Sequence, residues 1–427
     1  MATHRIPGLV LTDHELDVPL DHARPGGERI TVFAREVVAA EREGDALPWL
    51  LYLQGGPGGK SPRPASSAEG AWLGRALRHF RVLLLDQRGT GRSTPANRQT
   101  LSARGGAAAQ AAYLAHFRAD GIVRDAELLR EALIGDAPWS VLGQSYGGFC
   151  ALTYLSQRPE RLREVLIAGG LAPLDAHPDD VYRATYRRTL ERNRALLARY
   201  PQDEDRAGAV VRHLRERDVR LPGGPRLTPR WFQALGMRMG ATAGLEEIHY
   251  LLDEAFAGGP GGPELSDAFL HAVGGRLSFA SAPLYAILHE SIYCQGVASC
   301  WSAHRVRDEF GAFDADRGGP VRFTGEMIFP WMLAEDPALA PLAAAGAIAA
   351  EERWPPLYDG ATLAANRVPC AAAVYVDDMY VDRELSLRTA AAVRGLRPWI
   401  TNQHVHDALH RDGAVFDRLL ALARGWE

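Results

Sequence analysis

Short apolar runs constrain the fold of this chain more than any other feature. Three of them lie early in the sequence: LPWLLYL (47–53), RVLLLD (81–86) and WSVLGQS (139–145). Runs of this length without alternation suit strands that are buried on both faces of a mostly parallel sheet. A helical pattern, IVRDAELLREALIG (122–135), precedes the third run and ends at a glycine. Strands that alternate with helices predict a doubly wound α/β sheet.

The middle of the chain has a different character. Residues 173–367 are rich in helical patterns and arginine, are interrupted by Gly/Pro segments and show no clear buried strand. Strand patterns occur on both sides of this stretch, the first two before it and the last two after it: ERITVFAREVV (28–38), PERLREVLIAGG (159–170), CAAAVYV (370–376) and RPWIT (397–401). A length of 427 residues is too long for one compact core of usual size and favours either one domain with a large insertion or two domains.

We therefore expect an α/β core that is split by a helical cap. Residues 1–172 would form the first part of the core, 173–367 the cap and 368–427 the second part of the core. The chain would close with an amphipathic helix, AVFDRLLALARG, that turns one face to the core. The residues expected on that face are Val415, Phe416, Leu419, Leu420 and Leu422.

The bulk properties exclude some partners. A net charge of −4 and a pI near 6.4 argue against nucleic acid and anionic membranes. The N-terminus lacks a signal-peptide pattern, and the longest apolar stretch (338–350) is too short to span a bilayer. The four cysteines form no CxxC pair, and a bond between Cys294 and Cys300 is left open. We expect a cytoplasmic protein and make no prediction of its oligomeric state.

The segment GQSYG (143–147) matches the G-x-S-x-G pattern. It follows a predicted strand and precedes a helical pattern, which is the setting of a nucleophile elbow. In such an elbow the serine, here Ser145, lies on a sharp turn that projects its hydroxyl above the sheet. The alternative is a plain glycine-rich turn, which is less consistent with this strand–turn–helix order.

The segment LQGGPGGKS (53–61) follows an earlier strand and has two functional interpretations. A phosphate-binding loop would need glycine at position 54, where the chain has Gln54. An oxyanion loop fits better, because acyl transfer needs two N–H donors aimed at the developing negative charge. One donor would be Tyr146, which follows the serine, and the other Gly55 or Gly56.

Two further segments are polar and follow predicted strands. DQRGTGRS (86–93) lacks the third glycine of a dinucleotide motif, so we expect a turn held by a buried ion pair between Asp86 and Arg88. VYVDDMYVD (374–382) lies after a late strand, where this serine chemistry needs a carboxylate. Its candidates are Asp377, Asp378 and Asp382.

The segment TNQHVHDALH (401–410) lies in the expected last loop before the final helix. A general base is expected there, and the candidates are His404, His406 and His410. A metal site is the alternative, since H-x-H stands next to Asp407. A two-metal hydrolase would need further ligands, and no histidine follows this segment. We predict neither a metal nor a cofactor.

Taken together, these segments resemble the longer members of the proline iminopeptidase family of α/β hydrolases. The matching motifs are QGGPG, DQRGTGRS, GQSYGG, DDMYV and an N-terminal LDVPLDHARP. The resemblance implies an α/β-hydrolase fold with Ser145 as nucleophile, Asp378 as acid and His406 as base. It also places the oxyanion donors at Gly56 and Tyr146.

Three positions depart from the family pattern. Gln54 stands where the family has histidine, Ala408 where it has glycine and His410 where it has arginine. The last two lie beside the predicted base, so the motif by itself does not exclude His410 as the base.

The family binds the free amino group of its substrate with acidic residues of the cap. Two cap segments are suited to this, HESIYCQG (289–296) and FTGEMIFPWM (323–332), so Glu290 and Glu326 are predicted to bind the amine. The alternative is that each pairs with a cap arginine. Three aromatic residues are predicted to wall the slot for the proline ring, unless they belong to the cap's own core: Tyr293, Phe329 and Trp331.

The predicted activity is hydrolysis of the bond after an N-terminal proline in short peptides, through an acyl-enzyme on the serine. Tripeptidyl aminopeptidases share much of the same core, so such an enzyme or an esterase is the nearest alternative. A non-catalytic binding protein of this fold is a third, less favoured because all three triad candidates are present.

Overall fold

The computed structural model describes residues 2–66, 71–260, 262–317, 319–342 and 344–426. Its centre is a nine-stranded sheet in the order β1-β2-β3-β5-β4-β6-β7-β10-β11. The first four strands of this order are antiparallel, and from β5 onward neighbours are parallel. The bounds are β1 Ala2–Ile6, β2 Leu9–Pro19, β3 Arg29–Ala39, β4 Trp49–Leu53, β5 Arg81–Asp86, β6 Trp139–Gln144, β7 Leu162–Ala168, β10 Cys370–Tyr375 and β11 Leu396–Thr401.

The central strands are the predicted apolar runs. In β4, β5 and β6 nearly every side chain is buried, because helices cover both faces of the sheet. The strands β3, β7, β10 and β11 also lie where they were predicted. The hairpin of β1 and β2 was not predicted. In β2 polar residues such as Asp13 and His14 stand at buried positions, which hides the apolar pattern of a strand.

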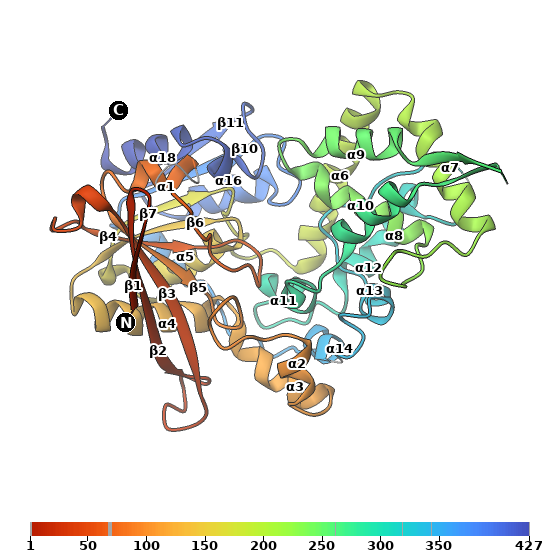
Figure 1. Cartoon of the computed structure of the whole chain (residues 1–427). Helices are drawn as coiled ribbons and strands as arrows, with labels where there is room; N and C mark the ends of the chain where they lie inside the picture. The colour runs from red at the N-terminus through yellow and green to blue at the C-terminus, as the bar shows by residue number, and fades with distance from the viewer. Residues whose placement is uncertain (1, 67–70, 261, 318, 343, 427) are drawn as a thin grey trace.

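Two groups of core helices form the outer layers (Figure 1). One face of the sheet packs against α1 and α18, and the other against α4, α5 and α16. In α18 the buried residues are Val415, Phe416, Leu419, Leu420 and Ala423, and the half-buried Leu422 packs against the same cluster, as predicted. The bounds are α1 Ala71–Ala76, α4 Ala119–Ile134, α5 Tyr146–Gln157, α16 Arg383–Ala392, α17 Ala408–Arg411 and α18 Ala414–Arg424.

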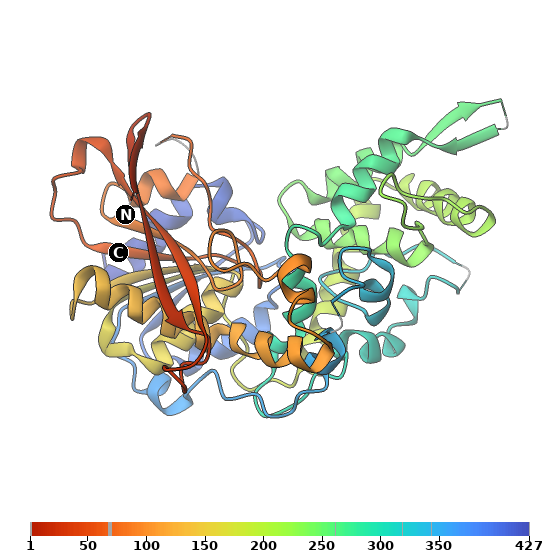
Figure 2. The same cartoon turned by 60° about the horizontal axis from the view of Figure 1, so that its bottom comes forward.

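A helical body between β7 and β10 lies beside this core (Figures 1 and 2). Its α-helices are α6 Pro178–Arg199, α7 Asp203–Glu216, α8 Pro229–Gln233, α9 Gly244–Asp253, α10 Asp267–Leu277, α11 Pro283–Leu288, α12 Ser302–Val306, α13 Pro330–Glu335, α14 Ala344–Ala349 and α15 Gly360–Ala364. An exposed hairpin of β8 Phe256–Gly259 and β9 Gly262–Leu265 projects from it.

The cap and the core are not fully separate. Two short core helices, α2 Arg98–Ser102 and α3 Ala107–Leu114, reach toward the cap, and α3 packs against α14 (Figure 2). Conversely, α15 packs against α5 and α16 of the core. The predicted division at residues 172 and 368 follows the strands and stays a prediction.

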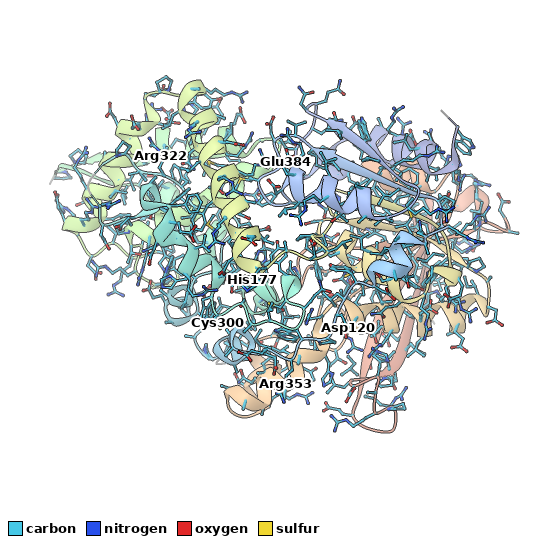
Figure 3. All side chains as sticks on the ribbon, turned by 180° about the vertical axis from the view of Figure 1, so that it is seen from behind. Asp120, His177, Cys300, Arg322, Arg353 and Glu384 are labelled. Carbon is cyan, nitrogen blue, oxygen red and sulfur yellow. The ribbon has the colours of Figure 1, made fainter. Side chains whose placement is uncertain are left out.

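Two further features concern the described chain as a whole. Among the described residues, no helix combines the length and the apolar character that crossing a membrane requires. All four cysteines are free, and Cys300 lies exposed on the cap (Figure 3).

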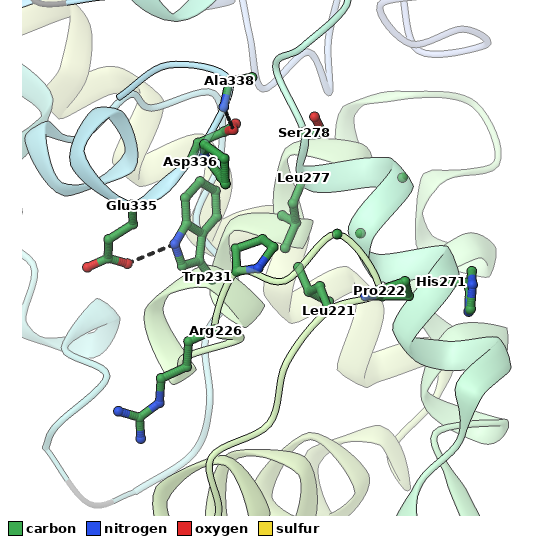
Figure 4. A pocket seen from close by; sticks show the side chains of 15 residues that line it. Leu221, Pro222, Arg226, Trp231, His271, Leu277, Ser278, Glu335, Asp336 and Ala338 are labelled. Carbon is green, nitrogen blue, oxygen red and sulfur yellow. Dashed lines mark hydrogen bonds between the residues drawn. The ribbon is translucent and has the colours of Figure 1, made fainter. Parts of the chain in front are cut away.

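The cap also contains an open cavity of about 420 Å³ (Figure 4). Trp231, Leu221 and Leu277 line it, and Glu335 accepts the indole N–H of Trp231 there. None of the predicted site residues lines this cavity.

Candidate active site

Ser145 occupies a strained turn between β6 and α5. Its φ of 54° and ψ of −126° lie in a region that L residues rarely adopt. The flanking glycines make the turn possible. A Cβ on Gly147 would lie 1.9 Å from the carbonyl oxygen of Leu53, and one on Gly143 would lie 2.3 Å from the carbonyl oxygen of Gly147. The predicted elbow is therefore present, with Ser145 immediately before the helix.

Three side chains from distant segments meet at this turn. His406 Nε2 lies 2.8 Å from Ser145 Oγ, and His406 Nδ1 lies 2.8 Å from Asp378 Oδ2. Asp378 follows β10 and His406 follows β11, and these parallel strands end at the same edge of the sheet as β6. Both Asp378 and His406 are buried, so water does not weaken their interaction. This geometry can activate a serine for acyl transfer.

Of the three aspartates proposed for the acid, only Asp378 reaches the histidine. Its second oxygen accepts the N–H groups of Tyr380 and Val381, at 2.8 and 3.1 Å, which fixes the carboxylate. Asp377 is exposed. Asp382 caps the first turn of α16 and pairs with an arginine of α6.

The other two histidines of the loop have different surroundings. His404 is half-buried and lies 3.8 Å from Asp412. His410 Nε2 lies 3.4 Å from the hydroxyl of Tyr52, and the same hydroxyl donates to Gln54 at 2.7 Å. Burial lowers the pKa of His410. Gln54 and His410, which both depart from the family pattern, thus contact the same hydroxyl of Tyr52.

Electrostatics favour a basic His406. Burial lowers its pKa, but the adjacent Asp378 carboxylate outweighs burial by charge and hydrogen bond, so the pKa is raised above that of free histidine. The more distant charge of Glu326 acts in the same direction. The ring of Tyr380 packs edge-on against His406, with 4.7 Å between ring centroids.

The QGGPG loop lies against the nucleophile. A Cβ on Gly55 would stand 3.0 Å from the Cβ of Ser145 and 3.2 Å from the carbonyl oxygen of Gln144, so glycine suits this close approach. Gly56 has a φ of 148°, which also favours glycine. Tyr146 is the first residue of α5, where N–H groups have no acceptor within the helix. The arrangement suits an oxyanion hole formed by backbone N–H groups of the loop and the helix.

The predicted pair of Asp86 and Arg88 was wrong in its partners. Asp86 is fully buried and binds Arg63 and the N–H of Ser61, so it ties the QGGPG loop to the turn after β5. Arg88 instead forms a fully buried ion pair with Asp125 of α4, at 2.6 Å. Sequence proximity had suggested a local pair, but a side chain inside the core takes its partner from a neighbouring element.

Glu290 is buried and both its oxygens are bound. They accept the N–H groups of Ser302 and Ala303 at 3.0 and 2.9 Å, at the start of α12. Burial raises the pKa of Glu290, although these hydrogen bonds oppose it. Glu290 therefore holds α12 in place, and no arginine in the described part of the chain pairs with its oxygens.

Glu326 has the more open environment of the two. One of its oxygens accepts the hydroxyl of Tyr285, and the other lies 3.9 Å from His289 Nε2. Its side chain is 12% exposed, and its charge raises the pKa of His406. No arginine of the described residues pairs with Glu326. This carboxylate can accept a cation near the triad.

The three predicted aromatic residues do not lie together. Tyr293 packs edge-on against Phe149 of α5, with 5.9 Å between centroids, and so lies beside the elbow helix. Phe329 and Trp331 stack on one another, and Trp331 packs against Trp231 inside the cap. The sequence alone does not distinguish the wall of a substrate slot from the hydrophobic core of the cap, because aromatic residues have the same spacing in both.

Two residues of the site were not predicted, His289 and Tyr285. Both lie on one face of a short cap segment, four residues apart, and their rings stack at 4.9 Å. His289 directly precedes Glu290 and follows the apolar segment LYAIL, so a histidine beside a carboxylate in an apolar segment was the available signal. Among the described residues, no group of three or more His, Cys, Asp or Glu side chains could hold a metal ion.

Comparison with known proteins identifies the family of the chain. A family model described as the alpha/beta hydrolase fold matches residues 48–223. The chain is 50% identical over 422 residues to a proline iminopeptidase of Aeromonas sobria and covers 98% of both chains. It is 37% identical over 437 residues to the proline iminopeptidase aneH of Aspergillus aculeatus, covering 98% of this chain and 95% of that one.

A more distant likeness is confined to part of the chain. The serine protease Hip1 of Mycobacterium tuberculosis is 27% identical over 199 residues, which covers 40% of this chain and 37% of that protein.

Proposed function

Because the chain belongs to the proline iminopeptidase family of α/β hydrolases, we propose that Ser145, His406 and Asp378 are the catalytic triad of a proline-releasing aminopeptidase. The protein is a serine aminopeptidase that releases N-terminal proline from peptides. The observation that carries the assignment of the triad is the unbroken chain of hydrogen bonds from Asp378 through His406 to Ser145, each 2.8 Å long.

The reaction proceeds in two steps. His406 accepts the proton of Ser145 as Oγ attacks the prolyl carbonyl carbon, and Asp378 stabilises the resulting imidazolium. The N–H groups of Gly56 and Tyr146 bind the oxyanion of the tetrahedral intermediate. His406 then gives its proton to the leaving amine, and the amide bond breaks to leave a prolyl ester on Ser145. Water, deprotonated by His406, hydrolyses this ester and releases proline.

The substrate's amine fits the cap side of the site. Glu326 and Glu290 are both proposed to contribute negative charge, with Glu326 in contact and Glu290 at a distance because its oxygens are bound to α12. Tyr293 is proposed to wall the proline slot, since it lies between the elbow helix and His289. Phe329 and Trp331 support the cap behind it.

The cap is proposed to restrict the substrate to short peptides. Residues 173–367 act as this cap over a core formed by residues 1–172 and 368–427. Side chains of α11 lie close to the loop of Gly58, where an added Cβ would stand 2.7 Å from the Cβ of Leu284. We further propose that the enzyme acts in the cytoplasm, where short peptides are available; it needs neither nucleic acid nor a membrane as partner.

A substrate panel tests the proposal. Proline p-nitroanilide, a tripeptide p-nitroanilide and p-nitrophenyl butyrate are compared by kcat/KM on the same preparation. The proline substrate should be preferred, and a clear preference for the tripeptide or the ester would favour a tripeptidyl aminopeptidase or an esterase. A fluorophosphonate probe should label wild-type protein and not Ser145→Ala. Failure to label folded wild-type protein would favour a binding protein.

A further inference from the structure

A buried histidine and a partly buried glutamate of the cap face one another across a gap that is too wide for a hydrogen bond. His289 Nε2 and Glu326 Oε2 are 3.9 Å apart. Neither ring nitrogen of His289 has a hydrogen-bond partner among the described residues, although the side chain is only 1% exposed. Buried polar atoms without partners are rare and costly in folded proteins. The gap therefore suits a polar group that both side chains can bind.

The surroundings fix the imidazole and keep it neutral. The ring of Tyr285 stacks on His289 at 4.9 Å, and the ring of Tyr293 meets it edge-on at 6.3 Å. Burial lowers the pKa of His289 and outweighs the opposing charge of Glu326. A neutral imidazole has one ring nitrogen with a free lone pair, which can accept a hydrogen bond. Next to an anionic Glu326, this makes a pair of acceptors.

The separation of the two acceptors matches a single nitrogen donor. A nitrogen about 2.9 Å from each atom, the usual N–H···O and N–H···N distance, fits between atoms that are 3.9 Å apart. The acceptors then subtend about 85° at the nitrogen, a moderate bend from the tetrahedral angle. N-terminal proline carries a secondary ammonium group with two N–H bonds, whereas every other N-terminal residue carries a primary group with three.

We propose that His289 is a specificity-determining residue, whose Nε2 accepts one N–H of the substrate's secondary ammonium group while Glu326 accepts the other. This inference rests on the proposed function. The two acceptors satisfy both N–H bonds of proline and leave the third N–H of a primary ammonium group unpaired in a buried site. An unpaired buried donor penalises the wrong substrate more strongly than a small misfit in an apolar slot.

The first test replaces the imidazole by a ring without acceptors. His289→Phe keeps an aromatic ring that can stack on Tyr285 and meet Tyr293 edge-on, and His289→Gln restores an amide acceptor. We measure kcat/KM for proline p-nitroanilide, alanine p-nitroanilide and p-nitrophenyl butyrate. His289→Phe should lower the prolyl value about 10- to 100-fold and the alanyl value by less. Hydrolysis of the ester should stay within about twofold of wild type, and His289→Gln should recover part of the prolyl preference.

Tyr182→Phe is the matched control. The Tyr182 hydroxyl is also buried without a partner among the described residues, and the charge of Glu326 raises its pKa. However, the atom that lies 3.9 Å from Glu326 Oε2 belongs to His289 and not to Tyr182. The ratio of prolyl to alanyl activity should not change in this variant. A ratio that depended on Tyr182 and not on His289 would overturn the inference.

A second test needs no mutation and so does not depend on folding. N-methylalanine p-nitroanilide has a secondary ammonium group but no ring. Wild-type enzyme should prefer it to alanine p-nitroanilide by about 10-fold or more. Equal rates for these two substrates, with proline still preferred, would show that the ring alone is selected and would overturn the role of His289. Failure of wild-type enzyme to cleave proline p-nitroanilide would instead refute the proposed function.

Discussion

At the scale of single residues, His406 alone among the three histidines of its loop bonds to both Ser145 and Asp378. We expect His406→Ala to lower kcat for proline p-nitroanilide by about 10⁴- to 10⁶-fold, as removal of triad members does. His404→Ala and His410→Ala should retain most of the activity, because their rings contact Asp412 and Tyr52 instead. Steady-state kinetics decide this, and an inactive His410→Ala with an active His406→Ala would refute the assignment.

The pH profile offers a second test at this scale. Activity needs neutral His406, so it should fall as the pH drops through the raised pKa of this residue, at a higher pH than free histidine would give. The charge of Glu326 contributes to that raised value. Glu326→Gln should therefore move the acid limb to lower pH.

The measurement uses p-nitrophenyl butyrate, which has no amine for Glu326 to bind. Replacement of an exposed, remote carboxylate, Asp136→Asn, is the control and should leave the limb unchanged. An unchanged limb in Glu326→Gln would mean that the carboxylate is too distant or too well screened to act on His406.

The same raised pKa has a consequence for stability. A histidine whose pKa is higher in the folded than in the unfolded state stabilises the fold, and this contribution is complete at pH values below the pKa of the unfolded state. That contribution is lost as the pH rises through the folded pKa. The enzyme's active form is thus the one in which His406 no longer adds this stability.

The contacts of Asp378, His406 and Ser145 could be predicted from the sequence because each residue stands in a local motif. The surroundings of the two glutamates could not. Glu290 binds the first N–H groups of α12, which begins 12 residues later, and only the fold shows that this turn returns to it. Likewise, Glu326 meets Tyr285 and His289 across 41 and 37 residues of sequence. A motif records which residues react, whereas the partners that orient them come from tertiary structure.

At the scale of elements, continuous apolar runs gave the central strands correctly because both faces of those strands are covered. The N-terminal strand β2 was missed for the opposite reason. Its Asp13 lies directly opposite Arg35 of β3 and pairs with it at 2.7 Å, and His14 pairs with Glu36 at 2.9 Å. Charged residues that pair across two strands resemble loop residues when the sequence of only one strand is considered.

The buried pair of Arg88 and Asp125 joins three elements and can be tested directly. Arg88 binds Asp125 of α4 through two nitrogens and also donates to the carbonyl oxygens of Leu20 and His116. Removing one partner of a buried pair leaves an uncompensated charge, so Asp125→Asn should destabilise the protein by about 3–5 kcal/mol.

Urea denaturation measures this effect. The exposed pair of Arg161 and Asp136 is the control, and Asp136→Asn should change the free energy of unfolding by less than about 1 kcal/mol. Equal effects at the two sites would contradict the structural role assigned to the buried pair.

At the scale of the whole molecule, the proposed active site lies where the core and the cap meet. The core contributes the proposed triad, and the cap contributes the residues proposed to bind the substrate, Glu326, His289 and Tyr293. Arg118, at the start of α4, spans this junction: its guanidinium donates to the carbonyl oxygen of Cys294, next to Tyr293, at 2.6 Å. It also lies 4.4 Å from the ring centroid of Trp354. One core residue thereby holds the cap segment that follows the substrate-binding residues.

The burial of the Arg118 guanidinium carries an energetic cost. It is 1% exposed, its Nε and Nη1 atoms have no partners, and no carboxylate of the described residues forms an ion pair with it. Burial lowers its pKa, which records the penalty for keeping the charge there. A buried charge of this kind often costs stability when compared with an apolar side chain of similar size.

Arg118→Met should therefore separate stability from function. The apolar side chain fills the same space, so thermal unfolding should occur at an unchanged or higher temperature. Without the bond to Cys294, the cap segment is less well positioned, and KM for proline p-nitroanilide should rise several-fold while kcat/KM for p-nitrophenyl butyrate stays near wild type. A junction that serves only stability has no reason to affect the prolyl substrate alone. A lower unfolding temperature with an unchanged KM would therefore show that Arg118 stabilises the fold and does not position the cap.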